Sequence, residues 1–143
     1  MKSSVAVEVR YAETDQMGVV HHRHYLTWFE LARTHWMRDV GFSYTELEAQ
    51  GLLFPVTDVA VRYRRPARYE DRLDIEVALA GLGSSRMSFT YRVLRAGELL
   101  TEGTTRHAAC DTRLRLLRME RSFPDLYARL RRSLEVPPSD PSG

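Results

Sequence analysis

The feature that most constrains this chain is one long helical pattern over residues 23–40, which is too apolar to lie on a protein surface. Its apolar side chains recur at helical spacing: Tyr25, Trp28, Phe29, Ala32, Trp36 and Val40 form the stripe, and Leu26, Leu31 and Met37 widen it. Gly41 follows and is a natural helix stop. Because a helix that is apolar around so much of its circumference must be covered, we expect it to be mostly buried.

The rest of the chain supplies a sheet that can cover this helix. Residues 73–79 and 87–93 alternate between apolar and polar side chains, and the turn sequence between them predicts two adjacent antiparallel strands. Further strands are predicted at 4–11, 53–65 and 98–112, a short helix between Ser43 and Gly51, and a last helix after Ser122. The order predicts an α+β domain in which a curved antiparallel sheet surrounds a central helix.

Length and composition favour a single globular domain. With 143 residues, 43% hydrophobic and 28% charged, we expect one domain over residues 1–136 and a disordered tail at 137–143. No apolar run has the ~20 residues that span a bilayer, and the N-terminus lacks the apolar core of a signal peptide. The single cysteine, Cys110, allows no intrachain disulfide and favours a cytoplasmic location.

Basic residues are concentrated near the C-terminus. Residues 113–132 hold seven arginines against Glu120 and Asp125, whereas residues 1–112 are nearly neutral. Such a segment can bind the phosphates of nucleic acid or of a small ligand, or it can be a solvated helix face. Because it has no series of aromatic residues for base stacking, we expect no nucleic-acid partner.

Serine and cysteine nucleophiles are not predicted. No G-x-S-x-G sequence is present. Cys110 and His107 lie three apart on one predicted strand, so their side chains point to opposite faces and cannot pair locally. A buried, unreactive thiol is the expectation for Cys110, and His107, like His35, is expected to be a structural or surface residue.

The three histidines that precede the long helix could suggest a metal site, since imidazole is a common zinc ligand. His21, His22 and His24 are close in sequence, but their spacing at a turn does not place three imidazoles on one side. No H-E-x-x-H sequence and no nearby cysteine ligand supports them. We therefore expect no metal site.

Asp15 is the stronger candidate for chemistry. It precedes Gly18 in a loop that leads into the long helix, whose first free N–H groups fall near His22 to Tyr25. A helix N-terminus has unpaired donors and a partial positive charge, which suit a developing oxyanion. A carboxylate facing such donors is the minimum for acyl transfer without serine or cysteine. The alternative from the residues alone is that Asp15 only caps the turn or the helix.

Two runs of residues at fixed spacing carry a family resemblance. The first is Tyr11-x-x-Thr14-Asp15-x-x-Gly18-x-Val20-x-His22-x-x-Tyr25, then Phe29-Glu30-x-Ala32-Arg33 and Gly41, and the second is Tyr63-Arg-Arg-Pro66-Ala-Arg-Tyr-Glu-Asp71. They resemble the signature of the 4-hydroxybenzoyl-CoA thioesterase family, in particular the branch of acyl-CoA thioesterases found in Tol–Pal gene clusters. The resemblance implies the hotdog fold, in which a sheet surrounds one long helix, as derived above.

The resemblance also implies site residues. Asp15 matches the catalytic aspartate, acting as nucleophile or as base for water. His22 matches the residue whose backbone N–H polarises the thioester carbonyl, and in this branch its side chain is also implicated. Substrate-binding positions would be Gly18, Val19 and Tyr25. His21 and His24 are expected to have no chemical role.

Family members are dimers or pairs of dimers with active sites at subunit junctions. The resemblance therefore implies an acyl-CoA substrate and a homodimer or homotetramer, with no cofactor beyond the coenzyme A of the substrate. Met17 and His21 depart from residues common in relatives, so the acyl preference stays open.

Ser85 and Arg86 are our candidates for binding a coenzyme A phosphate. They follow the Gly-Leu-Gly turn at a predicted strand start, where hydroxyl, N–H and guanidinium could face one phosphate. The 113–132 arginines are the other candidates, and Arg86 could instead be a solvated hairpin residue.

Two alternatives remain. Glu30, which could pair with Arg33 one helical turn away, could be the catalytic carboxylate in place of Asp15. The protein could also be a non-catalytic binder of acyl-CoA or acyl-carrier protein, although such a sensor needs no carboxylate beside the thioester.

Overall fold

The computed structural model describes residues 1–134, and the elements follow the predicted order. The strands are β1 (Lys2–Glu8), β2 (Val56–Tyr63), β3 (Arg72–Leu82), β4 (Arg86–Arg95) and β5 (Glu98–Ala108). The helices are a 3₁₀ turn (Tyr11–Glu13), α1 (Arg23–Asp39), α2 (Tyr44–Ala49), α3 (Met119–Ser122) and α4 (Pro124–Leu134). The predicted tail at 137–143 lies outside the described residues.

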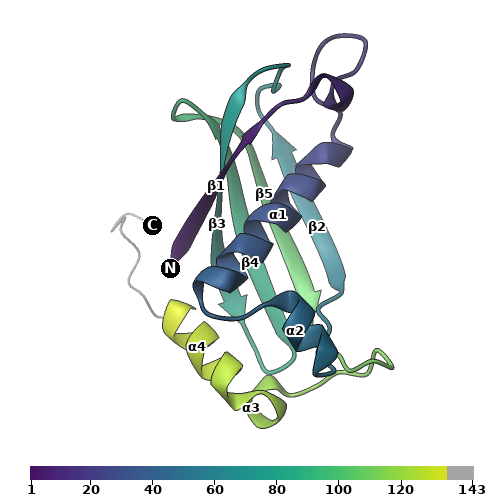
Figure 1. Ribbon diagram of the computed structural model, residues 1–143, viewed down its shortest axis with the longest axis vertical. Coiled ribbons are helices and arrows are strands. Elements are labelled where there is room, and N and C mark those ends of the chain that lie inside the picture. Colours follow the sequence, from purple (N-terminus) through teal and green to yellow (C-terminus); the bar gives the residue numbers. More distant parts are fainter. Residues whose placement is uncertain (135–143) are drawn as a thin grey trace.

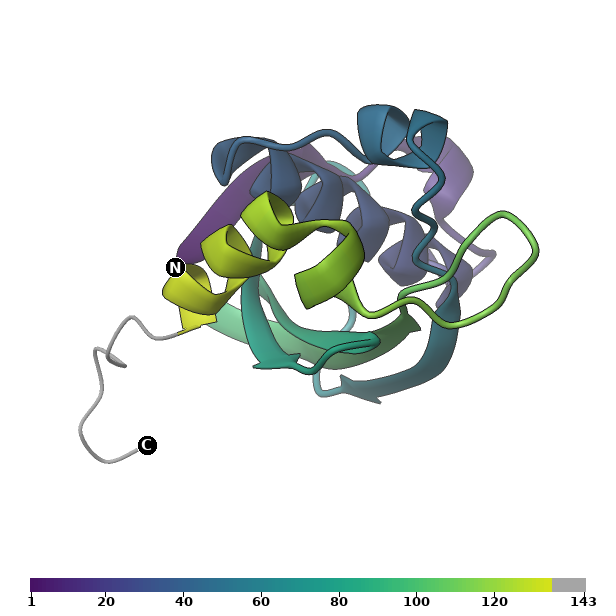
Figure 2. The same ribbon diagram turned by 90° about the horizontal axis from the view of Figure 1, so that it is seen from below.

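The five strands form one sheet in the order β1-β3-β4-β5-β2, and every neighbouring pair is antiparallel. The sheet curves around α1, which runs along its concave face (Figure 1). Figure 2 shows the helices as a second layer above the curved sheet, with α3 and α4 at one end. The predicted α+β arrangement of a curved antiparallel sheet around a central helix is confirmed.

The core lies between α1 and the sheet. Phe29, Ala32, Trp36 and Met37 of α1 have no exposed surface. Gly103 of β5 allows the closest approach, because a Cβ atom added there would lie 2.6 Å from Cζ of Phe29. This close approach of strand and ring fixes how deeply α1 sits in the sheet.

Three details of the sequence reading are wrong. Leu26 and Leu31 are exposed, because they lie on the side of α1 that faces away from the sheet. Strand β1 ends at Glu8 instead of Tyr11: Val9 and Arg10 lie outside it, and Tyr11 begins a 3₁₀ turn. Arg33 does not pair with Glu30; its Nη1 donates instead to the Tyr91 hydroxyl at 3.0 Å, inside the domain.

Strand β2 forms one edge of the sheet and is open to solvent on both faces. Of its eight residues only Val61 is partly buried, and Val56, Val59 and Tyr63 are large exposed side chains. An edge strand of this kind offers unpaired N–H and C=O groups to another chain.

No helix within residues 1–134 has the length and apolarity to cross a membrane.

Candidate active site

The loop before α1 holds Asp15 in a tight turn. The Gly18 N–H donates to the Asp15 carbonyl at 3.0 Å, and Gly18 has a φ of +78°, a conformation that costs a glycine little. The carboxylate is held by one oxygen: Oδ1 accepts from the Met17 N–H at 2.8 Å and from the Val19 N–H at 3.4 Å. Among the described residues nothing donates to Oδ2, so this oxygen is available for chemistry.

The chain between this turn and α1 is fastened on both sides. The Val20 N–H donates to the Ala67 carbonyl at 2.9 Å, and the His21 N–H donates to the Glu13 carbonyl at 3.0 Å. Glu13 is itself buried, and its Oε1 accepts from the Arg10 N–H at 2.8 Å. These bonds set the position of the first turn of α1 relative to Asp15.

His22 is the N-cap residue of α1, and in the described part of the chain its N–H lacks the hydrogen-bond acceptor that the neighbouring N–H groups have. The neighbouring Arg23 N–H donates to His21 Nδ1 at 3.3 Å, and the His24 N–H donates to the His21 carbonyl at 3.1 Å. Within residues 1–134 no acceptor is hydrogen-bonded to the His22 N–H. This donor lies at the positive end of a 17-residue helix, where it can stabilise a negative oxygen.

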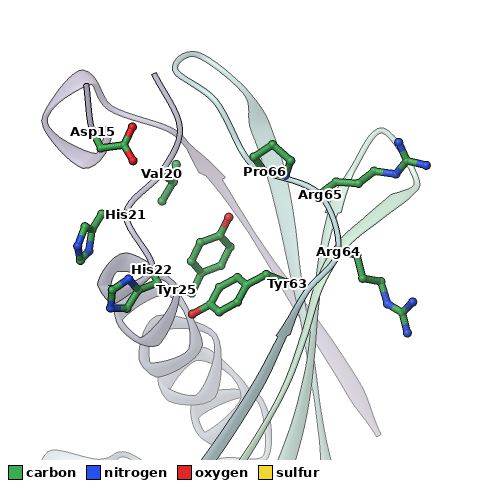
Figure 3. A pocket seen from close by; sticks show the side chains of 9 residues that line it. All are labelled: Asp15, Val20, His21, His22, Tyr25, Tyr63, Arg64, Arg65 and Pro66. Atoms are coloured by element: carbon green, nitrogen blue, oxygen red, sulfur yellow. The ribbon is translucent and has the colours of Figure 1, made fainter. Parts of the chain in front are cut away.

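A cavity of about 390 Å³ brings these groups together. It is lined by Asp15, Val20, His21, His22, Tyr25, Tyr63, Arg64, Arg65 and Pro66. Figure 3 shows the Asp15 carboxylate turned toward the cavity and the start of α1 forming its opposite wall. Of the predicted site residues, Asp15, His22 and Tyr25 therefore meet in one place, while Gly18 and Val19 shape the turn beside it.

Two tyrosines form the apolar wall. The rings of Tyr25 and Tyr63 pack edge to face with centroids 5.1 Å apart. Burial raises the pKa of Tyr25 above its usual value near 10, so its hydroxyl stays protonated at neutral pH. Tyr63 belongs to the family motif, but its place in the site is not evident from sequence, since only the fold brings the end of β2 against the start of α1.

The side chains of His21 and His22 are exposed at the cavity rim, whereas His24 is partly buried and does not line the cavity. The rings of His21 and His22 lie 4.2 Å apart between centroids, and desolvation together with the neighbouring His22 and Arg23 lowers the pKa of His21. His24 Nδ1 lies 3.9 Å from the buried Glu13 carboxylate. Within residues 1–134 no group of His, Cys, Asp or Glu has the arrangement of a metal site.

Ser85 and Arg86 lie far from this cavity in the same chain. Arg86 is opposite Ala108 on β5, whereas Tyr63 at the cavity is opposite Thr101. The offset of seven positions along β5 corresponds to roughly 23 Å of extended strand. The Ser85 hydroxyl donates to the Leu117 carbonyl at 2.6 Å, which gives it a structural contact.

Glu30 is likewise outside the cavity around Asp15. It lines a separate pocket together with Arg33 and Tyr44, between α1 and α2.

Known proteins are similar to this chain in sequence and in fold. The thioesterase-like superfamily matches residues 9–139. The chain is 35% identical over 127 residues to the putative acyl-CoA thioesterase YneP of Bacillus subtilis, covering 87% of this chain and 92% of that protein. It is 36% identical over 94 residues to the acyl-CoA thioester hydrolase YbgC of Escherichia coli O157:H7, covering 66% and 70%.

Solved structures of related proteins have the same fold as this chain. The DHNA-CoA thioesterase of Staphylococcus aureus superposes with a TM-score of 0.88 at 34% identity, covering 92% of this chain and 89% of that one. A hypothetical protein of Thermus thermophilus superposes with a TM-score of 0.85 at 40% identity, covering 93% and 98%.

Proposed function

Because the chain belongs to the thioesterase-like superfamily and is a thioester hydrolase, we propose that it hydrolyses acyl-CoA to a carboxylic acid and free coenzyme A, with Asp15 and the start of α1 as the active site. The observation that carries this proposal is that one acceptor and one donor without hydrogen-bond partners within residues 1–134 lie at the same cavity. Asp15 Oδ2 accepts no hydrogen bond and the His22 N–H donates none among the described residues.

In the proposed reaction the thioester carbonyl oxygen faces the His22 N–H. As the carbonyl carbon is attacked, negative charge grows on this oxygen, and the N–H and the helix dipole stabilise it. Collapse of the tetrahedral intermediate breaks the carbon–sulfur bond and releases coenzyme A, whose thiolate takes up a proton.

Asp15 can act in either of two ways. As a general base, Oδ2 takes a proton from the water whose oxygen bonds to the carbonyl carbon. As a nucleophile, Oδ2 bonds to that carbon directly, and water then hydrolyses the resulting anhydride. A single turnover in ¹⁸O-labelled water distinguishes the two routes, because only the nucleophilic route can leave the label in the Asp15 carboxylate.

Asp15→Asn tests the carboxylate. The variant keeps the size of the side chain and an oxygen for the Met17 N–H, but it has no charge. We expect kcat for acyl-CoA to fall by roughly two orders of magnitude or more with the fold intact. Glu30→Gln is the control, and an inactive Glu30→Gln beside an active Asp15→Asn would reassign the catalytic carboxylate to Glu30.

Proline at position 22 tests the backbone donor. His22 has a φ of −55°, which proline can adopt, so His22→Pro removes the N–H while preserving this dihedral. We expect kcat to fall by about 10²–10³, as for loss of one oxyanion donor. His22→Ala keeps the N–H and removes the imidazole; if it is as inactive as His22→Pro, the side chain and not the backbone is responsible.

The oligomeric state is proposed to be a homodimer or homotetramer with the active site at a subunit junction. The support is the exposed edge strand β2, which ends at Tyr63 in the cavity wall. Two copies of such a strand can pair antiparallel about a two-fold axis. Sedimentation at micromolar concentration that shows a fully active monomer would refute this assembly.

Substrate range and location complete the proposal. Coenzyme A enters as part of the substrate and no other cofactor is expected. The acyl group is left open, and hydrolysis of a panel of short, long and aromatic acyl-CoAs would identify it. We place the protein in the cytoplasm because its single cysteine suits a reducing compartment.

A further inference from the structure

None of the basic side chains that line the cavity around Asp15 points into it, where it could bind the phosphates of coenzyme A. Its two arginines, Arg64 and Arg65, point away from Asp15 and His22 (Figure 3). Both are engaged with carboxylates: Arg64 Nη2 lies 2.8 Å from Glu102 and Arg65 Nε lies 3.3 Å from Glu98. The charges that receive a phosphorylated substrate must therefore come from beyond these nine lining residues.

A cationic hairpin projects from the opposite end of the domain. It comprises residues 111–118 and extends away from the body beside the start of β2 (Figures 1 and 2). Asp111 fixes its shape, because Oδ1 accepts from the Arg113 N–H at 2.8 Å and from the Arg115 N–H at 2.9 Å. A bridge between Cys110 and Leu116 closes its base.

The side chains of this hairpin are an unusual mixture for a surface loop. Leu114 and Leu116 are 66% and 62% exposed, and Arg113 and Arg118 beside them are exposed as well. Leu114 also has a φ of +62°, a left-handed conformation that is unfavourable for a branched side chain. Two exposed leucines between arginines suit a surface that is apolar and meets phosphate.

Pairing through β2 would exchange the two ends of the domain. In an antiparallel pair the Val56 end of one strand lies beside the Tyr63 end of the other. The hairpin follows β5 just beyond His107, which is opposite Val56, whereas Thr101 at the cavity end is opposite Tyr63. A two-fold axis through β2 therefore carries the hairpin of one chain to the Asp15 cavity of the other.

The surfaces that would meet are complementary. Tyr11 and Met17, which flank Asp15 in the loop, are 75% and 76% exposed. Both ends of the domain therefore present large apolar side chains that are unusually exposed to solvent. A two-fold interface requires each surface to face the other twice. The hairpin leucines against Tyr11 and Met17 satisfy this requirement, and the arginines then lie at the cavity mouth.

We propose that hairpin 111–118 acts in trans: in the dimer it covers the mouth of the partner's Asp15 cavity, and its Arg113 and Arg118 receive the phosphates of the partner's acyl-CoA. This inference rests on the proposed function and adds the source of the charges. It also assigns the exposed leucines a contact, with the Asp15 loop of the second copy.

The first test is the double variant Arg113→Ala/Arg118→Ala. It should raise KM for acyl-CoA about fivefold to tenfold, with kcat within about twofold, because the contact is the same in ground and transition states. KM for an acyl-pantetheine, which lacks the nucleotide, should not change. Arg38→Ala/Arg132→Ala removes the same charge from α1 and α4 and should leave both KM values unaltered.

Mixed dimers decide between action in trans and in cis. Two differently tagged chains are co-expressed and the heterodimer is purified on both tags. When one chain carries Asp15→Asn and the other carries the hairpin double variant, the single active cavity faces an intact hairpin, and KM should be normal. When one chain carries all three substitutions and the other none, the active cavity faces the altered hairpin, and KM should rise.

The reverse pattern would show that cations of the same chain serve the cavity and would overturn the inference. An unchanged KM in every hairpin variant would overturn it as well while leaving an active thioesterase. A wild-type protein that hydrolyses no acyl-CoA of the panel would instead refute the proposed function, so the two failures are distinguishable.

Discussion

Replacing Gly103 with alanine tests whether the sheet sets the depth of α1. A Cβ atom at this position would lie 2.6 Å from Cζ of Phe29 and closer still to its Cε2, where an ordinary contact needs 3.4 Å or more. Phe29 cannot turn aside easily, because it has no exposed surface and its ring is stacked on Tyr91 with centroids 4.3 Å apart and planes 13° from parallel. The helix or the strand must therefore move.

The expected cost follows from overpacking a filled core. Inserting one methyl group without room typically lowers the free energy of unfolding by about 1–3 kcal/mol, which corresponds to a fall in Tm of roughly 3–10 °C for a chain of this size. Urea denaturation of the purified variant measures it. Gly83→Ala is the matched control, because its added Cβ would meet only the Arg86 carbonyl oxygen at 4.0 Å, and it should change stability little.

A double-mutant cycle identifies the cause. Phe29→Leu removes the ring atoms that the new methyl group would strike, so Gly103→Ala should cost much less in the Phe29→Leu background than in the wild type. Equal costs in both backgrounds would show that the Phe29 contact is not responsible. A Gly103→Ala protein as stable as the wild type would refute the argument altogether.

Three further predictions concern pH, assembly and coenzyme A. Burial, with a smaller contribution from the Arg33 charge, lowers the pKa of His107 to about 4 from 6.5. Between these pH values the unfolded chain binds a proton that the folded chain does not, so the free energy of unfolding should fall by roughly 1–3 kcal/mol, after solvent screening, as pH drops from about 6.5 to 4. The free energy of unfolding of His107→Gln should depend less on pH over this range. Val59→Lys places a charge on the exposed β2 edge and should yield a 16.6 kDa monomer by sedimentation, with a raised KM for acyl-CoA, and a dimer with unchanged KM would exclude β2 as the interface. If Arg86 binds phosphate, Arg86→Ala should raise KM for acyl-CoA with kcat unchanged, less so at high salt, and an equal rise for acyl-pantetheine would mean that it supports the pocket instead.

Much of the fold is predictable because its signals are local and repeated. Apolar side chains recur at helical spacing in α1 and at every second position in the strands, so the types and order of these elements are confirmed. The resemblance to acyl-CoA thioesterases, including the YbgC branch, is confirmed for the same reason, since its motif fixes many positions at once.

The errors arise where the partner of a side chain is distant in sequence. Leu26 and Leu31 follow the same helical spacing as the buried residues, and spacing alone does not show which side of α1 the sheet leaves open. Arg33 has a carboxylate one turn away, yet it donates to Tyr91, 58 residues along the chain. The approach of Tyr63 to Tyr25 likewise depends on β2 lying at the sheet edge.

The position of the site at the free edge of the sheet links its chemistry to assembly. Asp15 and the His22 N–H are oriented entirely by bonds within one chain, to Met17, Glu13 and their neighbours, so the acyl-transfer groups need no second copy to be in place. The cavity wall, in contrast, ends at Tyr63, the last residue of an edge strand whose backbone is unpaired on its outer side. A monomer would thus retain the reacting groups but leave the binding surface open to water. Loss of the dimer should consequently appear first as a higher KM, and as a lower kcat only where exclusion of water also strengthens the oxyanion contact.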